Sequence, residues 1–544
     1  MPFAYHRKRY AEQWRRATNS SLNLSEQASD EGDLYSASCQ LLLAHEDKIY
    51  HGAMIASLAI PWGHIRSDQE GAGGYHLVWP RDMVQCALAL LAVGNRGTPL
   101  SSLIYLAMAK QPDGGFAQNF WINGMPFWKG IQLDEAAFPI LLAYRLWKEE
   151  ALAGFDPLGM ILHACGYLVA HGPITEQERW EEISGYSPST LAACIAALIG
   201  AAAYLRFRKE ETTAVFIEEY ADYLESHLEE WTVTTRGELV DGISRHYVRI
   251  NPAASGSAAK PFDVDTAMAT LTSQAPGSNA TYPARNIVDA GFLELVRYGI
   301  RSASDSIIED SIRVVDRVLK VETPSGCTWR RYNHDGYGQC ADGGPYDQFG
   351  TGRAWPLLAG ERGHYEIAAG RLAAEHIRSM EGFSTPTHLI PEQSWDEPDL
   401  PNGRLRCGRP TGSAVPLLWA HAEYVTLLRS AADCKVYARV DEAVQRYLAT
   451  DRQKVIHTVW SFAHPTTVCR PGRIMRLVAA APFEARWTHD GWDHALTGTS
   501  KPSKLGLHFA DLENVPEEST SIEFTFLWSE CGRWEGKNFG VAIG

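Results

Sequence analysis

The 544-residue chain lacks the short motifs of the common cofactor-dependent and nucleophilic enzymes. It contains no G-x-x-x-x-G-K-[ST], no G-x-G-x-x-G after a predicted strand, no H-E-x-x-H and no G-x-S-x-G. Phosphate cradling and a serine-hydrolase nucleophile are therefore unsupported. The histidines do not fall at the spacing of metal ligands. Acid–base chemistry by carboxylates is the main candidate that remains.

Positive charge and long apolar runs are also scarce. Fifty Lys and Arg stand against 65 Asp and Glu, a net charge of −15, whereas a duplex-binding protein is expected to carry a basic excess. The longest strongly apolar run, residues 191–205, is shorter than the ~20 residues of a membrane span. It predicts a buried core helix. We expect neither a nucleic acid nor a membrane as partner.

No export signal or thiol motif is visible either. The first 30 residues contain no seven-residue apolar stretch of the kind found in signal peptides. We therefore expect a soluble chain, and its localisation is left open. The ten cysteines include no C-x-x-C pair, which excludes a zinc ribbon or thioredoxin motif and favours reduced, buried thiols.

The first 450 residues are predicted to be helical. Residues 1–33 combine a basic amphipathic helix at 6–16 with a polar linker. Over residues 34–450, apolar positions at i, i+3, i+4 and i+7 predict about a dozen helices. Ser187 with Pro188 marks one helix start, and Gly94 marks a helix end. Long aromatic-rich loops between the helices suggest concentric helices with the loops gathered at one end.

After residue 450 the apolar pattern changes from helical to alternating. Ile522, Phe524, Phe526 and Trp528 occupy every second position, and residues 474–478 and 483–487 form similar short runs. In the first of those runs the repeating positions are 474, 476 and 478. Alternation bounded by Pro and Gly is typical of half-buried strands. We therefore predict a small all-β sandwich at residues 455–544.

Five loops of the helical region share one composition, in which Trp or Tyr stands beside an acid or an Arg. They are residues 75–82, 127–135, 179–186, 329–332 and 389–396. Aromatic faces can cover the C–H face of a sugar ring while charged groups bind its hydroxyls. The loops therefore suggest a shared saccharide site.

Simpler explanations exist for each of these loops. A single Trp-Arg-Asp loop is commonly a structural salt bridge. Glu181 and Glu182 could be two solvated acids ahead of a helix, and Glu392 could cap a turn. The saccharide interpretation requires that the five loops meet in space.

Longer motifs point to a family. YHLVWPRD, FWKGIQLDE, RWEEISGYSPST, WRRYNHDGYG, GTGRAWPLLAGERGHY, LIPEQSWDEPD and GRPTGSAVPLLWAHAEY occur in this order. Over about residues 40–445 the chain resembles the bacterial branch of glycoside hydrolase family 15, which contains glucoamylases and glucodextranases. The resemblance implies an all-α (α/α)6 barrel followed by a small all-β sandwich. It also implies inverting hydrolysis that releases β-D-glucose from the non-reducing ends of α-glucans, without a metal or cofactor.

The resemblance also assigns roles to individual residues. The first Glu of the W-E-E motif is the family's general acid and the Glu of the P-E-Q motif its general base, which implies Glu181 and Glu392 here. The W-x-R-D motif places Arg81 and Asp82 on the hydroxyls of the terminal glucose, with Trp79 nearby.

Other family positions imply further sugar contacts. Tyr75 falls where the family stacks an aromatic near the reacting sugar, and Trp128 matches the Trp that closes over the substrate. The remaining implied contacts are Trp180, Glu182, Arg331, Trp355 and Trp419. The first three match family motifs, and the last two rest on general loop position.

The chain departs from the family at its start. Bacterial relatives usually carry a β-sandwich domain before the barrel, whereas this sequence begins with a stretch that resembles the linker helix. The domain is missing, the sequence is a fragment, or a partner chain supplies the domain. The linkage is also open: α-1,4, α-1,6 and α,α-1,1 bonds all fit. A non-enzymatic carbohydrate-binding protein is the alternative outside hydrolysis, although both glutamates are present.

Overall fold

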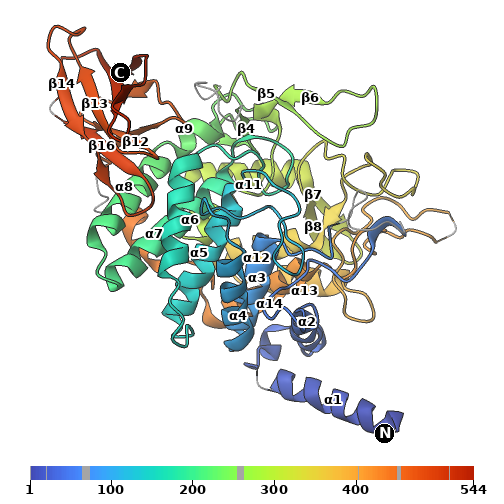
Figure 1. Cartoon of the computed structure of the whole chain (residues 1–544). Helices are drawn as coiled ribbons and strands as arrows, with labels where there is room; N and C mark the ends of the chain where they lie inside the picture. Colours follow the sequence, from blue (N-terminus) through green and yellow to red (C-terminus); the bar gives the residue numbers. More distant parts are fainter. Residues whose placement is uncertain are drawn as a thin grey trace.

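The computed structural model describes residues 2–19, 21–63, 74–253, 263–401, 403–449, 455–513, 515–516 and 518–544. Figure 1 shows a helical body with loops on one side and a β-rich region at the C-terminal end. The predicted change from helices to strands is confirmed: the last helix ends at Tyr447 and the next strand begins at His457. The predicted boundary at 450–454 lies outside the described residues.

Six helices contact one another in a closed order. They are α3 (Pro80–Ala92), α5 (Leu133–Lys148), α7 (Pro188–Phe207), α10 (Leu293–Arg297), α12 (Pro356–Ala368) and α14 (Leu418–Asp433), with α14 returning to α3. Their apolar side chains form one continuous buried cluster. This inner ring is the scaffold on which the loops rest.

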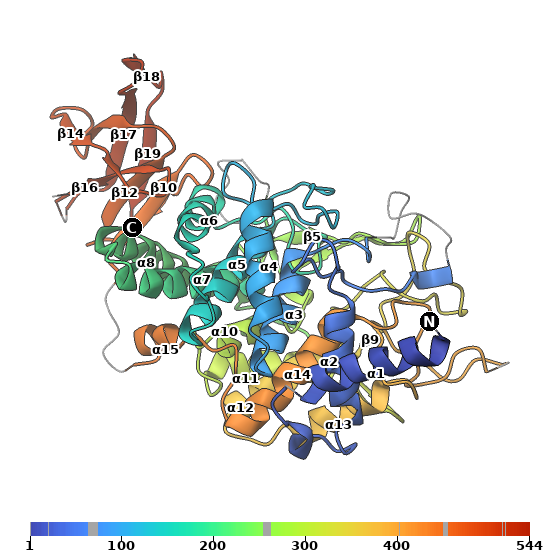
Figure 2. The same ribbon diagram turned by 60° about the horizontal axis from the view of Figure 1, so that its bottom comes forward.

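Other helices pack outside the ring. They are α2 (Asp33–Ala44), α4 (Gly97–Ala109), α6 (Leu158–His171), α8 (Glu211–Ser226), α11 (Ser306–Leu319) and α13 (Ala374–Phe383), with the shorter α9 (Leu228–Thr232) and α15 (Asp441–Tyr447). Most of the outer helices contact one or two inner helices, for example α4 with α3 and α5, whereas α11 packs mainly on short strands. Figure 2 shows α4 beside α3 and α8 beside α7.

Helix α7 shows how the sequence produces a ring helix. Ser187 caps its start, accepting from the backbone N–H of Thr190, and Pro188 fills the first turn. The helix is long and apolar enough to cross a membrane, yet 83% of its most apolar window is buried within the protein. Its composition is explained by burial against α5, α8 and α10, as the sequence predicts.

Short strands interrupt the helical region. They are β1 (Gly185–Tyr186), β2 (Val233–Thr234), β3 (His246–Tyr247), β4 (Asn251–Pro252), β5 (Met268–Thr270), β6 (Thr281–Pro283), β7 (Lys320–Thr323), β8 (Gly326–Arg330) and β9 (Ala354–Trp355). Every pairing among them is antiparallel. Within the described part of residues 34–449 no parallel sheet occurs, so the strands only brace the loops.

The C-terminal strands form two sheets. The first sheet has the order β10 (His457–Ser461), β12 (Ile474–Ala479), β16 (His508–Leu512), β15 (Lys501–Pro502). The second sheet has the order β11 (Val468–Cys469), β19 (Phe539–Ile543), β17 (Ser521–Trp528), β13 (Phe483–Thr488), β14 (Leu496–Thr499), and β18 (Arg533–Trp534) pairs with β17. Side chains from both sheets share one apolar cluster. The register Phe526↔Ala485 and Phe524↔Trp487 keeps alternate β17 residues on this inner face.

The prediction for residues 474–478 placed the wrong residues in the sandwich core. Met475 and Leu477 face the core between the sheets, whereas Val478 belongs to the cluster of the helical ring. Arg476 pairs with Asp511 and with Glu219 of α8. The strand is buried on both faces because α8 covers its outer side, and a strand with two buried faces loses its polar–apolar alternation.

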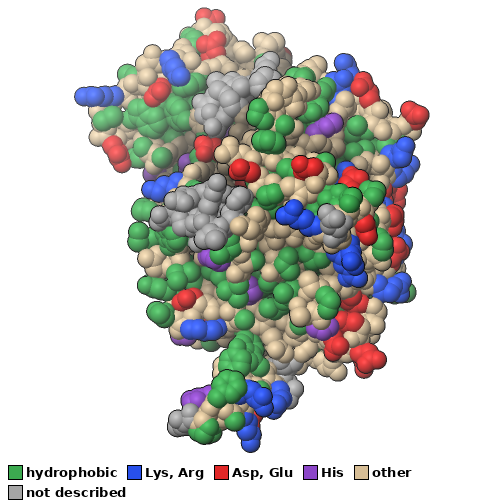
Figure 3. All heavy atoms as spheres, turned by 90° about the vertical axis from the view of Figure 1, so that its right-hand side faces the viewer, with side chains coloured by type: hydrophobic (Ala, Val, Ile, Leu, Met, Phe, Trp, Pro, Cys, Tyr) green, Lys and Arg blue, Asp and Glu red, His purple; other side chains and the backbone are tan. Residues whose placement is uncertain are grey.

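The N-terminal helix and the cysteines agree in part with the sequence-based expectations. Helix α1 (Phe3–Asn19) is longer than predicted and projects from the body, contacting α2 (Figures 1 and 3). All ten cysteines are unpaired, as expected. The expectation that they are buried is wrong for Cys340, Cys407, Cys434 and Cys531, which are partly or fully exposed, because these four lie on loops rather than on core-facing positions.

Candidate active site

A cavity of about 800 Å³ lies where the inner helices begin. Trp79, Trp355 and Leu417 line it, and they directly precede α3, α12 and α14. Helix N-termini gather partial positive charge, which favours oxygen-rich ligands and carboxylates. All five aromatic-rich loops contribute to the wall.

The structure brings the twelve predicted site residues together around this cavity. They are Tyr75, Trp79, Arg81, Asp82, Trp128, Trp180, Glu181, Glu182, Arg331, Trp355, Glu392 and Trp419. Their separation in sequence exceeds 300 residues, so only the closed ring makes them neighbours. The simpler explanations, in which the loops act separately, do not account for this convergence.

Glu181 projects into the cavity from a tight turn. Its backbone N–H donates to the carbonyl of Glu178 at 2.7 Å, and its φ of +66° lies in the left-handed region. A non-glycine residue held there costs about 1–3 kcal/mol, and such strain clusters at functional sites. The side chain keeps 24% of its surface exposed. Burial raises the pKa of Glu181 to about 7, against the opposing effect of Arg81.

Arg81 and Asp82 form the charged side of the cavity. The Arg81 guanidinium donates to Glu181 Oε1 at 2.6 Å and lies 3.6 Å from both Asp82 and Asp134. Burial raises the pKa of Asp82 above its ordinary value, partly offset by Arg81. Neither Nε nor Nη1 of Arg81 has a hydrogen-bond acceptor among the described residues. Both nitrogens are buried, and Nη1 belongs to the ion pair with Asp134.

Glu392 has a different environment. Tyr75 Oη donates to its Oε1 at 2.7 Å, and the backbone N–H of Ala414 donates to Oε2 at 3.3 Å. Tyr337 Oη adds a longer contact at 3.4 Å. Burial raises the pKa of Glu392 to about 7, and the bonds from Tyr75 and Ala414 limit the rise. Glu392 is thus held by neutral donors, whereas Glu181 is held by a cation.

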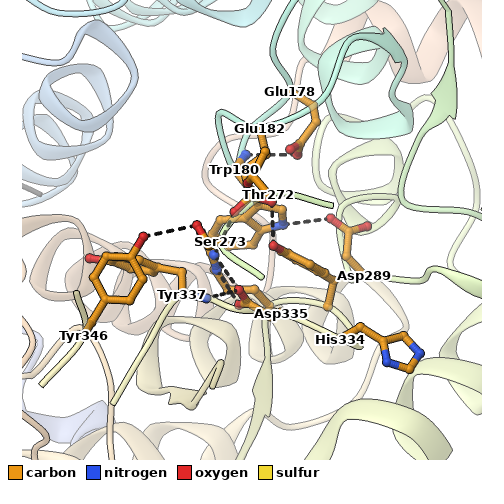
Figure 4. Close-up of polar contacts among 12 residues, drawn as sticks. Glu178, Trp180, Glu182, Thr272, Ser273, Asp289, His334, Asp335, Tyr337 and Tyr346 are labelled. Atoms are coloured by element: carbon orange, nitrogen blue, oxygen red, sulfur yellow. Dashed lines mark hydrogen bonds and ion pairs between the residues drawn. The ribbon is translucent and has the colours of Figure 1, made fainter. Parts of the chain in front are cut away.

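Glu182 and Arg331 belong to one buried ion network. Arg331 makes two bonds of 2.8 Å to Asp335 and a third of 3.2 Å to Glu182 Oε1. Its guanidinium also lies 5.5 Å from the ring centre of Trp355. Figure 4 shows Glu182 and Asp335 on this network, with Tyr337 beside it. The network fixes one wall of the cavity.

Four of the five predicted tryptophans divide into two groups. Trp180 donates through its indole N–H to Asp289 at 3.0 Å (Figure 4), and Trp79 donates to the Gly74 carbonyl at 2.8 Å, so these rings are fixed. The indole N–H groups of Trp355 and Trp419 are buried without a partner among the described residues. A buried N–H without a partner is unfavourable, so both suit a ligand acceptor.

A match to a protein-family model identifies the family of this chain. The sequence model for glycosyl hydrolases family 15 matches residues 29–110 and 114–429. The chain belongs to glycosyl hydrolase family 15. The resemblance inferred from the motifs is thereby confirmed.

Named family-15 relatives cover the helical region. A glucoamylase of Clostridium sp. (strain G0005) is 42% identical over 440 residues, which are 81% of this chain and 58% of that protein. A bacterial glucoamylase solved in complex with acarbose has a TM-score of 0.73 at 39% identity, over 82% of this chain and 62% of that one. The chain therefore spans less than two thirds of the length of both relatives.

A more distant match concerns the fold alone. A family-15 glucoamylase from Hypocrea jecorina has a TM-score of 0.53 at 13% identity, over 93% of this chain and 95% of that one. These matches show that the helical body has the fold of family-15 glucoamylases, and it is followed by a β-rich C-terminal region.

The family-15 cavity also contains residues that we did not predict. Tyr337, Tyr346, Thr272, Ser273 and Arg179 line it. Tyr337 and Arg179 lie within or beside the quoted motifs, so their motif positions could have indicated them. Thr272 and Ser273 follow β5 in a segment without a motif, and Ser273 meets Tyr346 through a hydroxyl contact of 3.1 Å (Figure 4).

Among the described residues no group of three or more His, Cys, Asp or Glu side chains is arranged to hold a metal ion. The cavity offers carboxylates, hydroxyls, guanidinium groups and indoles. This donor set suits a polyhydroxylated neutral ligand.

Proposed function

We propose that this cavity is the active site of an exo-acting, inverting hydrolase of the glucoamylase type. It releases β-D-glucose from the non-reducing ends of α-1,4-linked glucans. The observation that carries the proposal is the placement of Glu181 and Glu392 in one cavity with different partners, a guanidinium for the first and neutral donors for the second. Inverting glycosidases use two carboxyl groups in this way, ~6.5–9.5 Å apart.

Glu181 is the proton donor in this proposal. It transfers its proton to the glycosidic oxygen as the bond from that oxygen to C1 breaks. The neighbouring charges of Asp82 and Asp134 favour the protonated form of Glu181, whereas Arg81 opposes it.

Glu392 is the base in this proposal. It removes a proton from the water that attacks C1 on the face opposite to the departing oxygen. Tyr75 and Ala414 stabilise its ionised form by donating to both carboxylate oxygens. The attack from the opposite face inverts C1, so an α-glucoside yields β-glucose.

Recognition of the glucose at the chain end is assigned to the remaining wall. Arg81 and Asp82 bind its hydroxyls, and the free N–H groups of Trp355 and Trp419 donate to further oxygens. Trp128, which is 37% exposed, covers the mouth of the cavity. The relatives named glucoamylase support an α-glucan as the substrate.

The domain assignment belongs to the same proposal. Residues 34–450 form an (α/α)6-barrel catalytic domain, preceded by the helix and linker of residues 1–33 and followed by the sandwich of residues 455–544. The closed order of α3, α5, α7, α10, α12 and α14 supports the barrel.

Glucose release tests the proposal. The purified chain is incubated with maltose, isomaltose and α,α-trehalose, and with maltoheptaose for product analysis. We expect glucose from maltose, and from maltoheptaose only glucose with chains shortened one unit at a time. Fastest release of glucose from isomaltose would show that the enzyme prefers α-1,6 bonds. Internal cleavage of maltoheptaose would refute the exo-acting mode.

The pH profile tests the role of Tyr75. Tyr75→Phe removes an O–H donor from the Glu392 carboxylate, which destabilises the ionised form. The pKa of Glu392 therefore rises, and the acid limb of kcat/KM, which reports ionisation of the base, moves to higher pH. The basic limb should stay in place.

Tyr365→Phe is the matched control for this change. Tyr365 is also buried, and its hydroxyl donates to the Ala303 carbonyl outside the cavity. We expect no movement of either limb in this variant. An acid limb that stays fixed or moves to lower pH in Tyr75→Phe would contradict the assignment of Glu392.

A further inference from the structure

Arg249 is a buried charge that the mechanism above does not use. It follows β3, its side chain is fully buried, and it does not line the cavity. One nitrogen, Nη2, lies 2.6 Å from Glu178 Oε1 and 2.8 Å from Glu182 Oε2. A single guanidinium thus connects two carboxylates that lie four residues apart on the loop of the proposed acid.

The two carboxylates mark the ends of the turn that carries Glu181. Glu178 accepts the backbone N–H of Trp180 through Oε2 at 2.9 Å, and its carbonyl accepts the N–H of Glu181 at 2.7 Å. Figure 4 shows Glu178, Trp180 and Glu182 grouped on this loop. Between these fixed ends, Glu181 adopts its left-handed conformation. The turn keeps an unfavourable backbone angle because both of its ends are held.

Arg249 is itself fixed from the other side. Its guanidinium lies 3.6 Å from the ring centre of Tyr332, whose hydroxyl donates to Glu182. Its backbone N–H donates to the Ile287 carbonyl at 2.9 Å. Removing one member of a buried ion network leaves the others without compensation. Loss of Arg249 would therefore leave Glu178 and Glu182 buried without this counter-charge.

We propose that Arg249 is a positioning residue for Glu181. It clamps Glu178 to Glu182, so the turn between them presents the carboxyl group of Glu181 to the cavity. The inference rests on the proposed function in so far as Glu181 is the acid. The clamp itself is a structural statement that can be tested without activity.

The kinetic test compares two substrates. A glycosidic oxygen must be protonated to depart, whereas α-glucosyl fluoride has a good leaving group and needs little protonation. Arg249→Met should lower kcat on maltose by up to ~10²-fold, because a displacement of about 1 Å of a reacting group can cost that much. The loss on α-glucosyl fluoride should be at least several-fold smaller, and KM for maltose should change little.

Arg297→Met is the matched control. Arg297 is also buried and makes two bonds, of 3.0 and 2.9 Å, to Glu423 within the helical ring. We expect this variant to lose stability and to change both substrates by the same factor. Equal losses on the two substrates in Arg249→Met would overturn the positioning role and leave only a structural one.

A second variant and a crystal structure test the clamp independently of the Arg249→Met kinetics. If Arg249→Met fails to fold, as judged by circular dichroism, Glu178→Gln removes one carboxylate of the clamp and should show the same contrast between substrates. A crystal structure of the variant should show Glu181 outside the left-handed region, and an unchanged turn would overturn the clamp whatever the activity. A wild-type chain that hydrolyses no α-glucoside would refute the proposed function separately.

Discussion

Glu181→Gln and Glu392→Gln should each lower kcat on maltose by at least ~10²-fold, the usual scale of general acid–base catalysis. Glutamine preserves the shape of each side chain, but it can neither donate a proton to the glycosidic oxygen nor accept one from water. Both residues line the same cavity, so neither loss should be attributable to distant unfolding. Thermal unfolding of the two variants measures this directly.

The two variants should differ when the leaving group is changed. α-Glucosyl fluoride departs without much protonation, so it should partly restore the activity of Glu181→Gln. It still requires an activated water, so it should not restore Glu392→Gln. The reverse pattern would exchange the two roles, and equal restoration in both variants would contradict the pairing of an acid with a base.

Asp82→Asn should lower kcat/KM on maltose by ~10–10²-fold. Hydrogen bonds to charged groups contribute ~1.5–3 kcal/mol each, and the loss of a charged contact to a glucose hydroxyl acts on both the ground and the transition state. Asp82 is buried beside Arg81 at 3.6 Å, so the substitution also leaves Arg81 with one counter-charge fewer. Steady-state kinetics on maltose measures the effect.

Asp222→Asn is the matched control for this substitution. Asp222 lies on α8 outside the cavity and is as buried as Asp82. It accepts a hydrogen bond of 2.7 Å from Arg446 of α15. It should lower stability and leave kcat/KM on maltose within a few-fold of the wild type. Unchanged kinetics in Asp82→Asn would remove this residue from the site.

The inner wall of the site was predictable because it lies in motifs that punctuate helices. Trp79-Pro80 and Trp355-Pro356 start α3 and α12, and proline in a first turn is a local signal that needs no tertiary information. The same logic predicted the start of α7. These residues converge because the helices that follow them form one ring.

The supporting residues were not predictable, because their roles arise from long-range contacts. Arg249 lies in a segment with no motif, and its partners Glu178 and Glu182 lie about 70 residues earlier in the sequence. The left-handed angle of Glu181 likewise depends on those contacts. The core face of β12 was mispredicted for a related reason, since no sequence pattern reveals that Arg476 of β12 contacts Glu219 and Phe216 of α8.

The configuration of the first product tests the central claim most directly. Proton NMR of a maltose digest, recorded seconds after mixing and before mutarotation, distinguishes the anomeric signals of α- and β-glucose. Glu181 as acid and Glu392 as base on opposite faces of the sugar predict that β-glucose appears first. An α-glucose signal that appears first would show retention of configuration and would contradict the inverting mechanism and both assigned roles.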